Sequence, residues 1–330
     1  MSTDIQTPAG DDGILEGSAA WVGDQLDPQA GMVSIDDNCL TELIDLAAVL
    51  EANPVPVLTL DPDDFDLPAC RALMGRVKET LDTGVGFALI DRLPVEDLGR
   101  ERAIALYWLL GNMTGRAVAQ KWDGTMFYEV RDTGRVPMPG NGIRSSVSNR
   151  RQEFHTDNSY NLPPDYVALL CLHPAKEGGV SGIVSFQTAH NRMAELHPDL
   201  LQRLYRPYWF DRQYEHAPDD SEKVRKFPVF AHDGELLRTR YAISLMNGGH
   251  KLMDEPLDEV GREAMEALDR IIEEPVMCRE FDFKSGQIQI LDNRRIGHRR
   301  TGFEDWPDEE RRRHLIRLWF RNQGRPFYSG

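Results

Sequence analysis

Residues 154–172 read FHTDNSYNLPPDYVALLCL. The second half of this stretch, residues 166–172, is an apolar run typical of a buried β-strand, and the two prolines before it favour a turn. The first half carries His155 and Asp157. In an extended chain, residues i and i+2 point to the same face, so this imidazole and this carboxylate can bind one ion. The alternative is a polar turn, and the pair alone does not decide between them.

The chain after residue 120 alternates between short apolar runs and turn signals, which predicts many short strands. The predicted strands are YVALLCL (166–172), GIVSFQTA (182–189), FPVF (227–230), ELLRTRYAI (235–243), VMCREFDF (276–283), QIQILDN (287–293) and RHLIRLWFR (313–321). Two predicted helices, 189–206 and 256–274, interrupt these strands. This pattern favours a mainly β fold, a sandwich or barrel with flanking helices.

The first third of the chain is predicted to be mostly helical. Apolar residues recur at three- and four-residue spacing in segments 39–53, 70–84 and 100–115, and 86–93 is a strand candidate. Residues 1–15 are polar and rich in glycine, which predicts flexibility. We expect a single domain over 16–330, with helical support over about 36–115 and a β core over about 120–328.

Composition limits the partners. The formal net charge of −16, from 38 Lys and Arg against 54 Asp and Glu, opposes binding to nucleic acid, which needs a clustered basic surface. No apolar run approaches the roughly 20 residues that span a bilayer. The four separated cysteines and the acidic N-terminus predict a cytoplasmic protein without disulfides. A homo-oligomer is left open.

A second histidine would turn His155 and Asp157 into the two-histidine, one-carboxylate site of non-haem iron oxygenases. His298, which follows the predicted strand 287–293, is the best candidate among the nine histidines. Taken alone, its arginine-rich surroundings favour a cationic surface loop. Six others have no partner at ligand spacing: His173, His190, His197, His216, His232 and His250.

Two arginines of the last predicted strand can bind an acidic cosubstrate. Arg313 and Arg317 are four residues apart and therefore lie on one face of a strand. A guanidinium group can hold a carboxylate through two hydrogen bonds. The alternative is salt bridges to the acids at 308–310, which fits the neighbouring arginines at 311 and 312 better. The order H-x-D, a long spacer, a histidine, and an arginine about fifteen residues later is specific in combination.

These residues resemble the taurine dioxygenase family of iron(II)- and 2-oxoglutarate-dependent oxygenases, which includes clavaminate synthase-like and γ-butyrobetaine hydroxylase-like enzymes. The resemblance covers roughly residues 70–328. Its anchors are FHTDNSYNLPPDYVALLCL, AKEGGVSGIVSFQTAHN, LDNRRIGHRRTGF and RRRHLIRLWFR. It implies a double-stranded β-helix, a cupin-like jelly roll with a helical N-terminal part and iron at one end of the barrel.

The resemblance also implies roles for single residues. His155, Asp157 and His298 match the iron ligands, and Arg313 matches the arginine that binds the distal carboxylate of 2-oxoglutarate. Ser181 in GGVS stands where taurine dioxygenase has a threonine in GGDT, whose hydroxyl binds the same carboxylate. Arg317 stands at the sulfonate-binding position and Tyr160 at a pocket aromatic position, so both are substrate candidates. Apart from the resemblance, Arg151 with Arg144 and Arg150 indicates an anionic substrate, and the alternative is that these arginines pair with the protein's own excess acids.

The implied reaction uses iron(II), 2-oxoglutarate and O2 to hydroxylate an unactivated C–H bond of a small, anionic or amino-acid-like metabolite, with release of succinate and CO2. The carboxylate at Asp157 argues against halogenation. Desaturation, cyclisation and epimerisation remain open, because they use the same ligands. A metal-binding jelly roll without activity and a zinc hydrolase are rivals of other classes. The arginine clamp opposes the first, and the lack of an H-E-x-x-H motif opposes the second.

Overall fold

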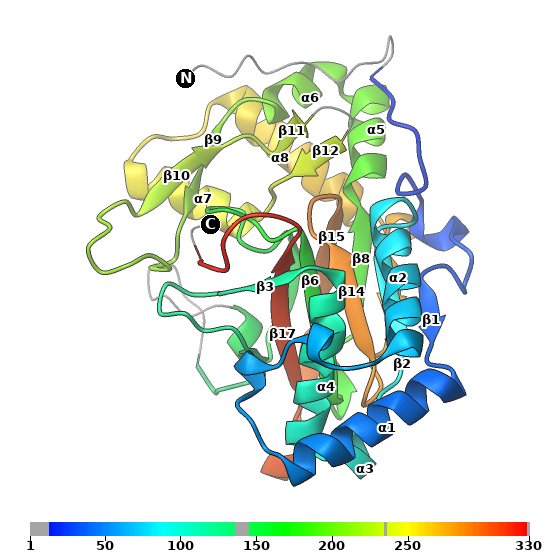
Figure 1. Ribbon diagram of the computed structural model, residues 1–330. Helices are drawn as coiled ribbons and strands as arrows, with labels where there is room; N and C mark the ends of the chain where they lie inside the picture. Colours follow the sequence, from blue (N-terminus) through cyan, green and yellow to red (C-terminus); the bar gives the residue numbers. More distant parts are fainter. Residues whose placement is uncertain (1–12, 136–144, 234–235, 329–330) are drawn as a thin grey trace.

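The computed structural model describes residues 13–135, 145–233 and 236–328, and in them the chain forms two main β-sheets with helices around them (Figure 1). The large sheet has the order β1 (Met32–Ser34), β2 (Phe87–Asp91), β14 (Ile288–Asp292), β6 (Tyr166–His173), β17 (His314–Arg321), β3 (Arg116–Val118), and β4 (Tyr128–Val130) also pairs with β17. The small sheet has the order β13 (Arg279–Phe281), β8 (Ser181–Ser185), β15 (Ile296–Arg300), β5 (Gln152–His155).

The central strand β6 is buried on both faces, as its apolar run predicts. Ala168 and Leu170 belong to a core cluster shared with the helices, whereas Cys171 belongs to a cluster shared with the small sheet. The second cluster contains Leu315 from β17 and Ile183 from β8. The two main sheets therefore pack against each other, and alternate side chains of each strand face different layers.

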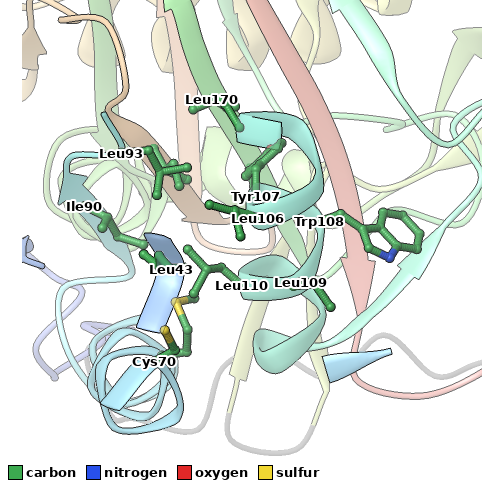
Figure 2. Close-up of a cluster of buried hydrophobic side chains, with 14 of the residues drawn as sticks. Leu43, Cys70, Ile90, Leu93, Leu106, Tyr107, Trp108, Leu109, Leu110 and Leu170 are labelled. Carbon is green, nitrogen blue, oxygen red and sulfur yellow. The ribbon is translucent and has the colours of Figure 1, made fainter. Parts of the chain in front are cut away.

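Helices α1 (Asp37–Ala52), α2 (Pro68–Asp82) and α4 (Arg100–Thr114) confirm the helical prediction for the first third of the chain and cover the outer face of the large sheet (Figure 1). Asp36 caps α1 by accepting a hydrogen bond from the backbone N–H of Cys39. Pro68 is the first residue of α2, where a backbone N–H would have no partner within the helix, so proline is tolerated there. Figure 2 shows Leu106 and Leu110 of α4 close to Leu43, Ile90 and Leu170 in this core.

A second group of elements gathers at one end of the sheets, at the top of Figure 1. It contains α5 (Phe186–Leu196), α6 (Pro198–Leu204), α7 (Ile243–Met253), α8 (Glu259–Ile272) and the strand pairs β9–β10 (Tyr208–Asp211, Val224–Phe227) and β11–β12 (Phe230–Asp233, Leu236–Thr239). The apolar faces of these elements share one core cluster with Phe154 of β5. The remaining elements are α3 (Val95–Leu98), the strand pair β7–β16 (Glu177–Gly178, Phe303–Glu304) and short 3-10 helices at 23–25, 57–59, 62–64, 145–147, 275–277 and 309–311.

Several predicted boundaries are wrong. The predicted strand 182–189 ends at Ser185, whose hydroxyl caps α5 by accepting a hydrogen bond from the backbone of Thr188. The predicted helix 189–206 is two helices, because Pro198 begins a new one after His197. Residues 243–253 form α7, which periodicity did not reveal because its three glycine and asparagine residues obscure the pattern. The predicted strand 276–283 keeps only 279–281, after a 3-10 turn.

The fold is therefore mixed α and β, and helices contribute more of it than the expectation of a mainly β chain allowed. Among the described residues, no helix is both long enough and apolar enough to cross a membrane. Residues 1–12 of the predicted flexible segment lie outside the described residues, and Leu15 at its end exchanges two backbone hydrogen bonds with the side chain of Asn191.

Candidate active site

Strand pairing brings His155 and His298 together. His155 ends β5, His298 lies in the middle of β15, and the antiparallel register places the two residues directly opposite each other. Their rings are 4.2 Å apart between centroids. With Asp157, they offer three ligand atoms that lie within 4.8 Å of one another, a cluster that fits a metal ion. The expected surface loop at His298 is excluded, because the residue is 8% exposed.

Asp157 does not lie in a strand, contrary to the argument that residues 155 and 157 share a strand face. β5 ends at His155, and Asp157 belongs to the turn that follows. Thr156 leaves the β5 ladder because its backbone N–H and its hydroxyl both bond to the backbone of Tyr241. The side chain of Asn293 holds Asp157 from the other side, accepting from its N–H at 2.7 Å and donating to its C=O at 3.1 Å. Tertiary hydrogen bonds therefore aim this carboxylate.

The Asp157 carboxylate is buried, and each of its oxygens accepts one hydrogen bond. Arg317 Nη1 donates to Oδ1 at 3.0 Å, and Trp319 Nε1 donates to Oδ2 at 2.7 Å. Burial raises the pKa of this carboxyl, but the charge of Arg317 and the contacts with His155 and His298 outweigh burial and hold the pKa far below its usual range. Asp157 is therefore an anion at neutral pH, as a metal ligand must be.

The two imidazoles present their Nε2 atoms to Asp157. His155 Nε2 and His298 Nε2 lie 3.6 and 3.9 Å from Asp157 Oδ1. The Nδ1 of His155 lies 2.9 Å from the C=O of Glu153, an acceptor that orients the ring. Its Nε2 faces Asp157 and lies 3.1 Å from the side-chain nitrogen of Gln152, a contact that a bound ion would replace. Burial and the charges of His155 and Arg317 lower the pKa of His298 to about 3, so its ring is neutral. Two imidazoles and one carboxylate form the donor set that non-haem iron(II) prefers.

Arg313 lies just before β17 and is 4% exposed. No carboxylate in the described part of the chain lies within 4.0 Å of its guanidinium nitrogens, so the alternative of salt bridges to residues 308–310 is wrong. Its Nη1 is buried and has no hydrogen-bond partner there. Burial lowers the pKa of this guanidinium to about 10. Ser181 begins β8, and its hydroxyl lies 3.3 Å from Gln289 Oε1.

The three substrate candidates differ in their surroundings. Arg317 lies against Asp157 and Gln120, and its Nη2 is buried without a partner in the described residues. Tyr160 is buried in the apolar cluster of α5–α8. The side chain of Arg151 is 54% exposed and pairs with Glu273. Arg144 lies outside the described residues.

Sequence reasoning missed Trp319 and Asn293, which contact the triad through Asp157. Trp319 read only as an apolar residue of a predicted strand, and Asn293 read only as part of a turn after another. The parity of β17 offered one signal: Trp319 is two residues from Arg317 and so faces the same layer.

Residues 51–319 match the family described as taurine catabolism dioxygenase TauD, TfdA family. The chain is 26% identical over 317 residues to FR-33289 synthase of Streptomyces rubellomurinus, covering 95% of this chain and 92% of that protein. It is 25% identical over 320 residues to a taurine hydroxylase-like protein of Stachybotrys chartarum, covering 93% of this chain and 79% of that protein.

Solved structures share this fold. Asparagine oxygenase in complex with Fe(II), 2S,3S-3-hydroxyasparagine and succinate matches with a TM-score of 0.65 at 20% identity, over 88% of this chain and 94% of that chain. The non-heme iron oxygenase OrfP in complex with Fe, succinate and (3S)-hydroxy-L-Arg matches with a TM-score of 0.61 at 15% identity, over the same shares. The family match over most of the chain agrees with the buried His-Asp-His cluster: the chain belongs to the TauD, TfdA family and is an iron(II)- and 2-oxoglutarate-dependent oxygenase.

Proposed function

We propose that this oxygenase hydroxylates an unactivated C–H bond of a small, anionic or amino-acid-like metabolite. One atom of O2 enters the product as a hydroxyl group, and the other enters succinate as 2-oxoglutarate loses CO2. The observation that carries the proposal is the convergence of His155, Asp157 and His298 on one point inside the fold. Desaturation, cyclisation and epimerisation use the same ligands and are the alternatives that product analysis separates.

The choice of an amino-acid-like substrate is supported by the relatives. The names of the two matched oxygenase structures record hydroxylated asparagine and hydroxylated arginine as bound molecules. In this chain, Arg317 supports an anionic group on the substrate, because its Nη2 is buried and has no partner among the described residues. Its Nη1 remains bound to Asp157, so one guanidinium can orient both the ligand carboxylate and the substrate.

His155, Asp157 and His298 would hold iron(II), and Arg313 with Ser181 would hold the distal carboxylate of 2-oxoglutarate. When bound there, iron(II) supplies the redox chemistry that couples decarboxylation of 2-oxoglutarate to oxidation of the substrate. Two residues of the chain hold the aspartate ligand in position. Asn293 binds the backbone of Asp157, and Trp319 Nε1 donates to its Oδ2. The low exposure of Asp157 and His298 limits access of bulk water to the metal.

The finer architecture belongs to the same proposal. The packed large and small sheets are interpreted as the two halves of a double-stranded β-helix, supported by their shared core cluster. Residues 16–330 would form one oxygenase domain, supported by the core that α1, α2 and α4 share with the large sheet. The four free cysteines, three of them buried, support a reducing cytoplasmic location. We propose Arg317 and Tyr160 as residues of the substrate pocket. Arg151, whose exposed side chain pairs with Glu273, is the third substrate candidate, and the Arg151→Gln variant tests it.

The test is anaerobic addition of iron(II) and 2-oxoglutarate to the purified protein. We expect a visible charge-transfer band from the chelate in the wild-type protein and its loss in Asp157→Ala and His298→Gln. His190→Gln is the matched control, because His190 is also buried but bonds to Tyr205 instead of the triad. Succinate release in air is then measured with a panel of amino acids and small acids. A protein that shows no band, and whose metal content Asp157→Ala leaves unchanged, would contradict the proposal.

A further inference from the structure

Arg300 is a buried arginine that the proposed function does not yet use. It lies two residues after His298 in β15, so both side chains project from the same face of the strand. The register of β15 against β8 places Arg300 directly opposite Ser181, the residue expected to touch the distal carboxylate. Its side chain is 4% exposed, which is rare for an arginine unless it is paired.

The contacts of Arg300 leave most of its guanidinium unpaired. Nη2 donates to the carbonyl oxygen of Ser148 at 3.0 Å and to that of Arg150, which anchors the side chain. Nε and Nη1 are buried and have no hydrogen-bond partner in the part of the chain that the structure describes. A purely structural arginine that tied the 148–150 segment to β15 would not need these donors, and leaving them unpaired is costly.

Arg300 and Arg313 lie beside the same aromatic ring. Their guanidinium carbons are 4.6 and 5.2 Å from the centroid of Phe303. Burial, with the charge of Arg313 as a further cause, lowers the pKa of Arg300 to about 9, so both groups are still cations at neutral pH. Asp305 acts on both arginines and Asp132 acts on Arg300, but in the described residues no carboxylate oxygen lies within 4.0 Å of either guanidinium.

The unpaired buried groups around Arg300 are mostly donors, and Asp305 Oδ2 is an unpaired acceptor among them. Gln289, on the face of β14 that looks toward the small sheet, has a buried Nε2 without a partner in the described residues, while its Oε1 accepts from Ser181. Arg313 Nη1 is unpaired in the same way. Buried polar groups in folded proteins are nearly always hydrogen-bonded, so this set of N–H groups calls for a ligand that only accepts and that carries negative charge. A carboxylate meets both requirements.

We propose that Arg300 is a second arginine for the distal carboxylate of 2-oxoglutarate and that, with Arg313, it makes the enzyme select 2-oxo dicarboxylic acids over 2-oxo monocarboxylic acids. This inference rests on the proposed function. It adds that the far end of the cosubstrate site is a two-arginine clamp in which β15 supplies both a metal ligand and a carboxylate donor. Arg299, the residue between them, faces the other way and pairs with Glu273 and Glu280.

The experiment measures ligand binding without turnover. The iron(II)-loaded protein is titrated anaerobically with 2-oxoglutarate and with 2-oxopentanoate, which has the same chain length but no distal carboxylate. For Arg300→Gln we expect the Kd of 2-oxoglutarate to rise roughly 10- to 100-fold, the range for lost hydrogen bonds to a charged group. The Kd of 2-oxopentanoate should not change. Arg299→Gln is the matched control and should keep both values, and Arg313→Gln should behave like Arg300→Gln.

The ratio of the two dissociation constants decides the outcome. If Arg300→Gln weakens both ligands equally, or neither, Arg300 has a structural role only and the inference is overturned. If wild-type protein binds neither ligand, the proposed function itself fails, which separates the two conclusions. Should Arg300→Gln not fold, Arg300→Lys keeps the charge but loses the planar fork. For Arg300→Lys, the ratio of the Kd of 2-oxoglutarate to the Kd of 2-oxopentanoate should lie between the ratios of wild type and Arg313→Gln. A ratio equal to that of wild type overturns the inference.

Discussion

Replacing Asn293 by alanine tests whether the turn after β5 is what aims the metal ligand. The amide of Asn293 accepts from Asp157 N–H at 2.7 Å and donates to the carbonyl oxygens of Asp157 and Pro164 at 3.1 and 3.2 Å. Asn293→Ala leaves these three buried backbone groups without their partner. Each unsatisfied group costs about 1–3 kcal/mol, and because neighbouring losses are not additive we expect a total of about 2–4 kcal/mol.

The same change should weaken the metal site, because Asp157 would no longer be held in one position. We expect the metal affinity to fall roughly 10- to 100-fold, as it does when outer partners of metal ligands are removed. Stability is measured by urea denaturation, and affinity by competition with a chromophoric chelator for cobalt(II) or iron(II). A variant that loses stability but binds the metal as tightly as wild type would refute the reasoning.

The chain offers a close control for this experiment. Asn191 of α5 holds Leu15 with the same pair of hydrogen bonds, accepting from its N–H at 2.7 Å and donating to its C=O at 2.8 Å. This clamp fixes the N-terminal segment instead of the triad. Asn191→Ala should therefore lower stability by less than Asn293→Ala does, since its site is only partly buried, and it should leave the metal affinity unchanged.

Three further outcomes are expected. Trp319→Phe keeps the ring but removes the N–H that donates to Asp157 Oδ2, so metal affinity should fall roughly tenfold in the chelator assay, and an unchanged value would show that Arg317 alone suffices. Burial lowers the pKa of His190 to about 4, so between pH 6.5 and pH 4 the unfolded chain binds a proton at this residue that the folded chain does not. The free energy of unfolding of the wild type should therefore be highest above pH 6.5 and fall by up to about 3 kcal/mol toward pH 4. The fall should be smaller in His190→Gln. Arg151→Gln should leave substrate KM nearly unchanged, because the exposed side chain pairs with Glu273; a rise in KM, measured once a substrate is known, would return Arg151 to the substrate site.

The sequence predicted the members of the metal cluster but not the way in which they meet. Two histidines and a carboxylate in the right order form a chemical pattern, and this pattern can be recognised in a sequence without knowing how the strands pair. The register that sets His298 opposite His155 depends on packing between distant segments, which no local propensity encodes. The turn at Asp157 was misread for the same reason, because Thr156 leaves the strand to bond with Tyr241, a residue far away in the chain.

The helices illustrate the same division. α1, α2 and α4 are amphipathic enough, or apolar enough, to be predicted from periodicity, and they occur where expected. α7 was missed because it has little helical propensity over NGG and is stabilised by packing, with Met246 and Gly249 buried against the strands of the same end. Gly249 faces the backbone of Trp209 so closely that a Cβ would lie 2.5 Å from its carbonyl oxygen. Tertiary contact explains this glycine, and helical propensity does not.

Strand parity explains which polar residues of the chain face the site. On β17, Ile316 and Leu318 belong to the core under the helices, and the intervening Arg317 reaches Asp157 on the opposite face. On β15, His298 faces inward, whereas Arg299 pairs with glutamates of neighbouring elements. The arginines around His298 looked alike by composition and were read as one cationic loop. Because side chains alternate between the two faces of a strand, neighbouring arginines of β15 have different surroundings. A guanidinium that faces the core needs an acceptor there, whereas one that faces outward can pair with the chain's many acids.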